Sequence, residues 1–355
     1  MFAMILTPCL LPTADLWNNF NALKTEKQEN VMKIFVNVGT FIRDSFFYPE
    51  TVKRLESMAE VEYCPADPLS GDALREKLQG VDVLFTGWGQ RTIHRADLGD
   101  VKLIAHTGGT VGGIIAEDVF EAGIPVLSGN QYYAESVAEG VVAYMLFALR
   151  DMGYYASELH AGRWQENKTR GLLDKKVGIV SVGAISKMVI DHLSKFRCKI
   201  MAYSTRPNQA YAEQTGITYA SLDEIFSECD IVSIHTARTP QTYRMIGRHH
   251  YDLLKDGAIF INTSRGEVID GDALVEALKE ERFTAVLDVY DQEPLAAGHP
   301  LMECKNAILF PHQCGPTYDR RDYVTQRLLD DVEAFFSGKA MKNEIPLEVA
   351  RYMTH

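Results

Sequence analysis

Short apolar runs alternate with amphipathic stretches along most of the chain, beginning at about residue 32. Apolar runs of this length, separated by stretches with helical periodicity, are typical of parallel strands joined by crossover helices. The first series predicts five strands, in the segments MKIFVNVG, AEVEY, VDVLFTGW, VKLIAHTGG and GIPVLS.

A second series of the same kind begins near residue 176. It predicts six strands, in KVGIVSVG, CKIMAYS, CDIVSIHTA, GAIFINTS, FTAVLDVY and NAILFPHQ. The whole pattern therefore predicts an α/β protein of two domains, each a parallel sheet flanked by helices. The larger domain is expected to be a doubly wound, Rossmann-type sheet. The tail YDRRDYVTQRLLDDVEAFFSGK predicts a closing helix.

The segment SVAEGVVAYMLFALRDMGYYASELHAGRW lies between the two series. Ser136 and Glu139 have the spacing of a capping box, and apolar residues recur at helical spacing as far as Leu149. We expect one helix of about 25 residues that links the domains. Glu139, Arg150 and Asp151 interrupt its apolar character and disfavour a membrane span.

Length and composition narrow the class of protein. A chain of 355 residues has room for two cores, and its net charge of -12 disfavours a nucleic-acid interface. The six cysteines are scattered without a C-x-x-C pair, which favours reduced thiols in a cytoplasmic protein and predicts no metal site. Residues 1–30 are expected to be an extension. Their apolar start lacks a basic region and contains Pro8 and Pro12, so no signal peptide is expected.

The stretch VGIVSVGAISKMVIDHL is similar to a dinucleotide-binding turn of the pattern G-x-G-x-x-G. Only Gly183 is retained, and serines stand at positions 181 and 186. Phosphate binding depends mainly on backbone N–H groups at the helix start, so the motif can survive. Ser181 is expected to be strained by about 1–2 kcal/mol. Taken alone, the turn fits a nucleotide site and an ordinary strand-to-helix turn equally well.

The end of the next strand bears on the choice of cofactor. An NAD-specific site carries an acidic residue there, whereas this chain has Ser204, Thr205 and Arg206. Two hydroxyls and a guanidinium can bind a 2′-phosphate, which favours NADP over NAD. A surface turn with an incidental arginine is the alternative.

Three residues of the second half point to catalysis. Arg265, Glu293 and His312 each follow a predicted strand, and the carboxyl ends of parallel strands share one sheet edge. Taken singly, such residues are more often solvated or structural. Histidine is suited to transferring a proton near neutral pH. A carboxylate stabilises imidazolium, and arginine binds a substrate carboxylate through paired hydrogen bonds.

The segments INTSRGEVIDGDALVEAL, LDVYDQEPL and PHQCGPT, in this order, resemble the D-isomer-specific 2-hydroxyacid dehydrogenase family. AESVAEGVVAYMLFALR and AGRW strengthen the resemblance, which covers nearly all of the chain after residue 32. It implies that Arg265 holds the substrate, that His312 is the acid/base and that Glu293 is its partner. Glutamate at position 293 favours a hydroxyacid substrate, because the related formate dehydrogenases carry glutamine there.

The resemblance also implies a division of the chain and a set of cofactor-binding residues. Residues 1–128 with 315–355 would form the substrate domain, residues 129–314 would bind NAD(P), and the protein would be a homodimer. Asp288 would contact the nicotinamide carboxamide. The other cofactor-binding residues would be Gly183, Ala184, Ile185, Ser204, Thr205, Arg206, His235, Thr236, Thr263 and Ser264.

Some segments depart from the family pattern. The loop HTGGTVGGIIAED lacks the usual substrate-loop sequence, although its backbone N–H groups can still receive a carboxylate. Arg238 stands in an unusual place, facing either a second anionic group or, as we favour, solvent. Cys314 is a candidate nucleophile by position, but a packing role is favoured. The residues expected to bind substrate in that loop are Gly108, Gly109, Thr110 and Val111.

These observations predict an NAD(P)-dependent oxidoreductase that acts on a small 2-keto or 2-hydroxy acid, with no nucleic-acid or membrane partner. Two alternatives stay open at this point. One is a nucleotide-sensing scaffold of the corepressor type on the same fold, because such proteins can keep the triad. The other is a catalytically weak homologue whose altered turn binds the cofactor poorly.

Overall fold

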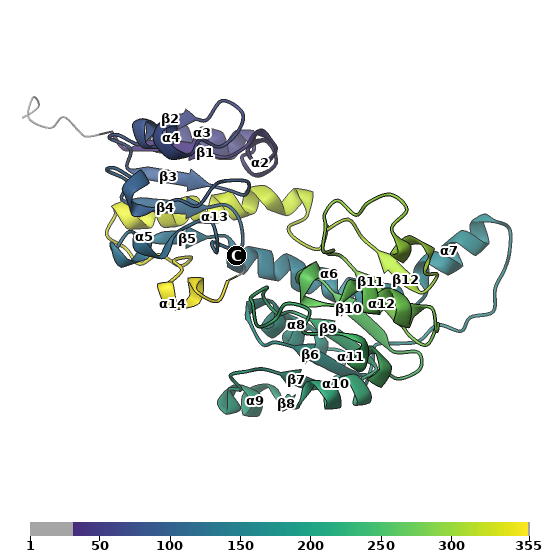
Figure 1. The fold of residues 1–355 in the computed structure, drawn as a ribbon. Coiled ribbons are helices and arrows are strands. Elements are labelled where there is room, and N and C mark those ends of the chain that lie inside the picture. Colours follow the sequence, from purple (N-terminus) through teal and green to yellow (C-terminus); the bar gives the residue numbers. More distant parts are fainter. Residues whose placement is uncertain (1–30, 354–355) are drawn as a thin grey trace, which may run out of the picture.

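The computed structural model describes residues 31–353, which form two α/β domains, each built on one parallel sheet (Figure 1). The predicted fold class is thereby confirmed. The extension expected at residues 1–30, and the expectation about a signal peptide, lie outside the described residues.

The smaller domain contains a five-stranded parallel sheet in the order β2-β1-β3-β4-β5. All five predicted strands of the first series are present. The central strands β3 and β4 are buried along their whole length, as expected for a parallel sheet covered on both faces. Their bounds are β1 Lys33–Asn37, β2 Glu60–Tyr63, β3 Val83–Thr86, β4 Leu103–His106 and β5 Val126–Ser128.

Helices from both ends of the chain cover this sheet (Figure 1). The closing helix predicted from the tail is α13, and its apolar side packs into the same core as the sheet through residues such as Val324 and Leu328. Glu344, beyond that helix, bridges to Leu127 at the sheet edge. The helical segments are α2 Thr40–Phe46, α3 Pro49–Met58, α4 Gly71–Lys77, η1 Arg95–Asp97, α5 Glu117–Glu121, α13 Tyr318–Phe336 and α14 Leu347–Ala350.

The larger domain contains a seven-stranded parallel sheet in the order β12-β11-β10-β9-β6-β7-β8. The six predicted strands are present. The seventh, β8, was not predicted because it has only two residues and pairs only with β7. The strands are β6 Lys176–Val180, β7 Lys199–Tyr203, β8 Thr218–Tyr219, β9 Ile231–Ile234, β10 Ile259–Asn262, β11 Thr284–Leu287 and β12 Ala307–Leu309.

The crossover segments of the larger domain are short helices and 3-10 turns. Their apolar residues form two clusters with the two faces of the sheet. The segments are α8 Ala184–Ser194, α9 Gln209–Thr215, α10 Leu222–Glu228, α11 Arg248–Leu253, η2 Gly266–Val268, α12 Gly271–Leu278 and η3 Pro300–Glu303.

The linking segment corrects two predictions. It forms two helices, α6 Asn130–Leu149 and α7 Met152–His160, because Asp151 adopts a left-handed conformation with φ 50°. The capping box is also wrong: the helix begins directly after β5, and Ser136 lies inside it. There its hydroxyl donates to the carbonyl oxygen of Tyr132 at 3.3 Å, a common arrangement for serine within a helix.

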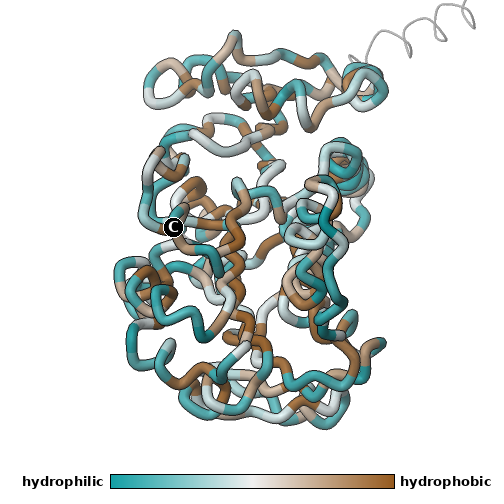
Figure 2. Tube along the Cα trace, turned by 90° about the vertical axis from the view of Figure 1, so that its right-hand side faces the viewer, coloured by the Kyte–Doolittle hydropathy of each residue, from teal (hydrophilic) through white to brown (hydrophobic). Residues whose placement is uncertain are grey.

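Helix α6 contributes to the cores of both domains. Tyr132 lies in the core of the smaller domain, whereas Val141 and Met145 lie in that of the larger one. Figure 2 shows hydrophobic segments running through the middle of both domains, with hydrophilic segments at the periphery. Within residues 31–353, no helix is long and apolar enough to cross a membrane, and no cluster of histidine, cysteine and acidic residues has the arrangement of a metal site.

Candidate functional site

The turn between β6 and α8 joins a buried strand to a helix that begins directly after Gly183. Ser181 has φ 79°, the left-handed region that glycine adopts without strain, which confirms the predicted strain. The Ser186 hydroxyl, fully buried, donates to the carbonyl oxygen of Ser181 at 2.6 Å. The two serines are therefore joined by a hydrogen bond that paired glycines cannot make.

Gly183 is the residue directly before helix α8, and it borders open space. A Cβ atom placed on Gly183 would meet no other atom within 4 Å. Helix α8 then starts at Ala184, and Ile185 follows, so N–H groups of its first turn have no partner within the helix. This combination leaves room and donors for an anion such as a pyrophosphate.

The segment after β7 places Ser204, Thr205 and Arg206 together. The Ser204 hydroxyl accepts a hydrogen bond of 3.1 Å from the backbone N–H of Arg206, which fixes the turn. The exposed guanidinium of Arg206 lies over the ring of Tyr352, with 4.1 Å between the guanidinium carbon and the ring centroid.

The ends of β9 and β10, neighbouring strands of the sheet, carry the next expected cofactor residues. Thr236 and Ser264 are buried there. The buried Nδ1 of His235 and Oγ1 of Thr263 are two of several buried side-chain polar atoms that lack a hydrogen-bond partner within the described residues. Buried polar atoms are rarely left unsatisfied. Together with the open space at Gly183, these two atoms fit a polar cofactor lying along this sheet edge.

Glu293 and His312 form a direct pair. The Nδ1 atom of His312 lies 2.6 Å from Oε2 of Glu293, and Oε1 of Glu293 accepts a 3.0 Å bond from the N–H of Tyr290. The His312 side chain is half exposed, at 51%. An ionised carboxylate only accepts hydrogen bonds, so Nδ1 carries the proton and Nε2 remains for another partner.

Arg265 lies close to this pair in a mostly buried position. Burial lowers the pKa of Arg265, while the nearby carboxylates of Glu293 and Glu267 raise it again. Its Nη1 donates to the carbonyl oxygen of Ser264 at 2.6 Å. The structure thus brings together the three residues that the sequence singled out.

A glycine explains how two of the loops come together. A Cβ atom on Gly266 would lie 1.9 Å from the carbonyl carbon of Tyr290 and 2.3 Å from the nitrogen of Asp291. Only glycine permits this contact between the loop that carries Arg265 and the loop that carries Glu293.

Asp288 connects the loop that carries His312 to the sheet. Its carboxylate accepts bonds of 3.0 Å from the backbone N–H groups of Gln313 and Cys314, directly after His312. It also accepts a bond of 2.8 Å from the hydroxyl of Tyr144 in α6. Asp288 is 1% exposed, so within the described structure its carboxylate holds the His312 segment in place. Its expected contact with a nicotinamide stays a prediction.

Two unusual residues of the sequence also have partners. Arg238, for which solvent was favoured, donates to Glu267 at 2.7 Å and stands close enough to lower the pKa of Arg265 further. Cys314 is buried, its thiol donates to the carbonyl oxygen of Val137 at 3.5 Å, and burial raises its pKa. This supports the packing role for Cys314. The five described cysteines are all unpaired thiols.

The expected substrate loop is anchored to the smaller domain. The Ser128 hydroxyl donates to the carbonyl oxygens of Gly108 and Gly109, at 3.1 and 2.8 Å. Val111 is fully buried, and Thr110 accepts a 3.3 Å bond from the N–H of Gly112. The expected contact of this loop with a substrate stays a prediction.

Sequence reasoning missed Tyr144 and Gly266. Tyr144 stands among the apolar residues of a helix, where its hydroxyl gives no separate signal. Gly266 belongs to a recognised motif, but the close approach that requires it depends on a loop about 25 residues further along the chain.

Comparisons with a family model, with related sequences and with solved structures give consistent results. Residues 142–314 match the family model described as "D-isomer specific 2-hydroxyacid dehydrogenase, NAD binding domain". The "D-3-phosphoglycerate dehydrogenase" of Methanocaldococcus jannaschii is 30% identical over 306 residues, which are 84% of this chain and 57% of that protein. This chain therefore spans little more than half the length of that relative.

The "Glyoxylate reductase" of Korarchaeum cryptofilum is 30% identical over 244 residues, 66% of this chain and 74% of that protein. Among solved structures, the TT0316 protein of Thermus thermophilus superposes with a TM-score of 0.70 at 26% identity. The match covers 88% of this chain and all of the other.

Proposed function

Because the chain belongs to the D-isomer specific 2-hydroxyacid dehydrogenase family, we propose that it is an NAD(P)-dependent oxidoreductase that interconverts a 2-keto acid and a D-2-hydroxy acid. The observation that carries the proposal is the Glu293–His312 pair, with Arg265 beside it at the carboxyl edge of the larger sheet. The similar proteins include a phosphoglycerate dehydrogenase and a glyoxylate reductase, so they support a substrate class and not one substrate.

In this proposal Arg265 binds the substrate carboxylate and carbonyl, which fixes the face of the carbonyl carbon that is presented for reaction. His312, protonated at both nitrogens, donates the proton of Nε2 to the carbonyl oxygen during reduction. Glu293 stabilises the imidazolium through its bond to Nδ1. A bound nicotinamide supplies the hydride, and the carbonyl becomes a hydroxyl with the addition of one hydride and one proton.

The residues proposed to hold the cofactor are those of the larger sheet edge. Backbone N–H groups near Gly183 would bind its phosphates, and His235 and Thr263 would supply the polar atoms that lack partners. We propose NADP as the preferred form, because Arg206 can bind a 2′-phosphate. We also propose that residues 129–314 form this domain, and that residues 1–128 with 315–355 bind substrate through Gly108 to Val111.

We also propose that the protein is a homodimer and that it has no nucleic-acid or membrane partner. Helix α7 has no buried residue, and it projects from the larger domain with the segment that follows it (Figure 1). Large apolar side chains are exposed along this projection, including Leu159 at 59% and Trp164 at 88%. Covering these apolar side chains with a second copy of the chain removes them from water and so stabilises a dimer. Light scattering of the wild type and a Trp164→Ser variant tests the dimer, which the variant is expected to weaken.

The function is tested by titrating NADPH and NADH into the protein and then screening a panel of 2-keto acids for cofactor oxidation. The panel should contain glyoxylate, hydroxypyruvate, phenylpyruvate and sugar-derived keto acids. Binding followed by turnover with formation of a D-2-hydroxy acid supports the proposal. Absence of binding contradicts it, and binding without turnover across the panel favours a nucleotide-sensing scaffold.

A further inference from the structure

The side chain of Arg206 meets a residue of the other domain. Its guanidinium lies over the ring of Tyr352, 4.1 Å from the centroid, and this ring is its only side-chain partner within residues 31–353. Arg206 follows β7 in the larger domain, whereas Tyr352 follows α14, which packs with α5 of the smaller one. Figure 1 shows α14 on the side of the smaller domain that faces the larger domain.

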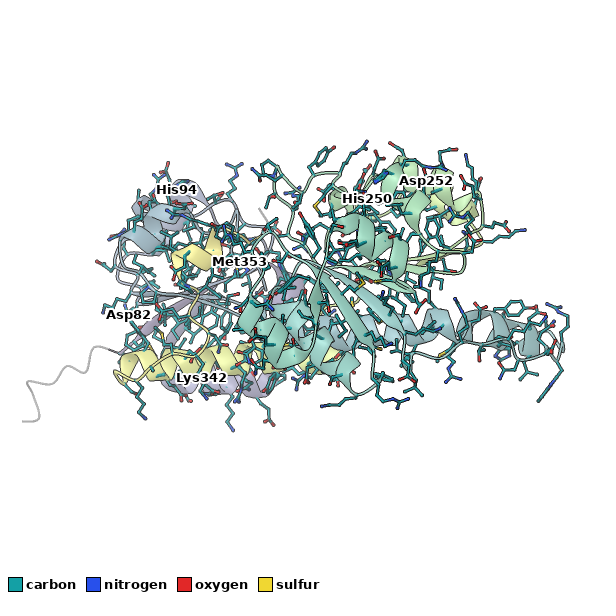
Figure 3. All side chains as sticks on the ribbon, turned by 90° about the horizontal axis from the view of Figure 1, so that it is seen from below. Asp82, His94, His250, Asp252, Lys342 and Met353 are labelled. Carbon is teal, nitrogen blue, oxygen red and sulfur yellow. The ribbon has the colours of Figure 1, made fainter. Side chains whose placement is uncertain are left out.

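The segment that carries Tyr352 is firmly held by the smaller domain. Ala350 is 7% exposed in a core cluster of that domain, and Met353 packs against the same cluster. Arg351 donates to Glu117 of α5 at 2.8 Å. Figure 3 labels Met353 beside the short helix of this segment. The position of the Tyr352 ring is therefore set by the smaller domain, on both sides of the residue in the sequence.

The geometry leaves Arg206 able to bind an anion. A guanidinium that lies over a ring keeps N–H groups at its rim, where phosphate oxygens bind. Both side chains are accessible, and the Tyr352 residue is 56% exposed. Some exposed arginines of this acidic chain pair with carboxylates, as Arg197 does with Asp174. No carboxylate within the described part of the chain pairs with Arg206.

We propose that Tyr352 is a positioning residue for cofactor specificity, which holds the Arg206 guanidinium in position for a 2′-phosphate. This inference rests on the proposed function and adds a residue of the smaller domain to the recognition of NADP. A guanidinium held over an aromatic ring has already lost conformational freedom. The entropy cost of ordering it when the phosphate binds is therefore smaller. NAD presents a hydroxyl at that place and gains little from the arrangement.

The test measures dissociation constants of NADPH, NADH and 2′,5′-ADP by calorimetry for the wild type, Tyr352→Ala and Tyr352→Phe. Tyr352→Ala is expected to weaken NADPH and 2′,5′-ADP by about threefold to fivefold, the range of an exposed cation–π contact, and to leave NADH unchanged. Tyr352→Phe keeps the aromatic face and should bind like the wild type. Tyr243→Ala removes another exposed tyrosine near an arginine, Arg244, and serves as the matched control without effect.

Equal changes for NADPH and NADH in Tyr352→Ala, or no change in either, would overturn the inference. A loss of NADPH affinity in Tyr352→Phe as large as that in Tyr352→Ala would also overturn the inference, because the aromatic ring would then not account for the effect. Failure of the proposed function gives a different result: 2′,5′-ADP binding would still respond to Tyr352→Ala, but no 2-keto acid would be reduced.

Discussion

The Nδ1 atom of His312 lies 2.6 Å from Oε2 of Glu293, and the backbone N–H of Tyr290 holds the second oxygen of that carboxylate. The carboxylate is thereby oriented by a loop of the larger sheet before any substrate arrives. It directs the other ring nitrogen of His312 away from the pair. Three features place this pair beside Arg265: the end of strand β11, the close backbone contact at Gly266, and the bonds that the Asp288 carboxylate accepts from the segment after His312.

Replacing Glu293 by Gln should lower kcat by about tenfold to a hundredfold, because a neutral amide loses the charge-assisted bond that stabilises imidazolium. Cofactor affinity should not change. Steady-state kinetics and NADPH titration make the comparison, with the exposed Glu303→Gln as control. Unchanged kcat in Glu293→Gln would show that the carboxylate does not assist His312.

Replacing Gly266 by Ala should destabilise the protein by about 1–3 kcal/mol or more, because the added methyl meets the backbone of Tyr290 at 1.9 Å. The separation of the Arg265 and Glu293 loops should also reduce kcat. Gly171→Ala is the matched control, since a Cβ atom there meets nothing within 4 Å. Denaturant unfolding measures both variants. Equal stabilities would contradict the close approach of the two loops.

Replacing Ser181 by Gly should raise the free energy of unfolding by about 1 kcal/mol, since glycine adopts φ 79° without strain. The same change at Ser157, in helix α7, should lower stability because glycine is a poor helix former. Denaturant unfolding of both variants measures the two effects. A lower free energy of unfolding for Ser181→Gly would contradict this prediction, because it would show that backbone strain at Ser181 is not the dominant effect.

The pH dependence of stability should include a contribution from His106. This residue is fully buried, and burial lowers its pKa to about 4. Between pH 6.5 and about 4 the unfolded chain therefore binds one more proton at this residue than the folded protein does. Stability falls as the pH is lowered through that range, by about 1.4 kcal/mol per pH unit for one histidine, and the contribution is constant above it.

His106→Gln removes this proton, so its unfolding free energy should depend less steeply on pH between 6.5 and about 4 than that of the wild type. His192→Gln, at an exposed position of α8, is the control. Urea unfolding at several pH values provides the measurement. Parallel pH profiles for wild type and His106→Gln would mean that His106 is not held neutral by burial.

Much of the fold could be predicted from the sequence because parallel strands and their crossover helices leave a strong periodic pattern. The five strands of the smaller domain and six of the larger one follow from that pattern alone. The two-residue strand β8 has no such pattern. The break at Asp151 was missed because its left-handed conformation depends on how α7 leaves α6, and the apolar content continues across it.

The candidate site was predictable where strand ends carry charged residues, as at Arg265, Glu293 and His312. It was not predictable where one loop contacts another. Asp288 illustrates the difference: its position after a strand was visible, but its bonds to the His312 segment and to Tyr144 depend on packing between distant segments. The stacking of Arg206 on Tyr352 likewise joins residues of two domains.

The most direct test of the account compares NADPH oxidation by the wild type and His312→Ala in the presence of a 2-keto acid that the wild type reduces. We predict a loss of kcat of about a hundredfold to ten-thousandfold in the variant, the usual contribution of a positioned general acid, with the dissociation constant of NADPH unchanged. Turnover by His312→Ala at the wild-type rate would contradict the assignment of this residue and, with it, the proposed catalytic triad.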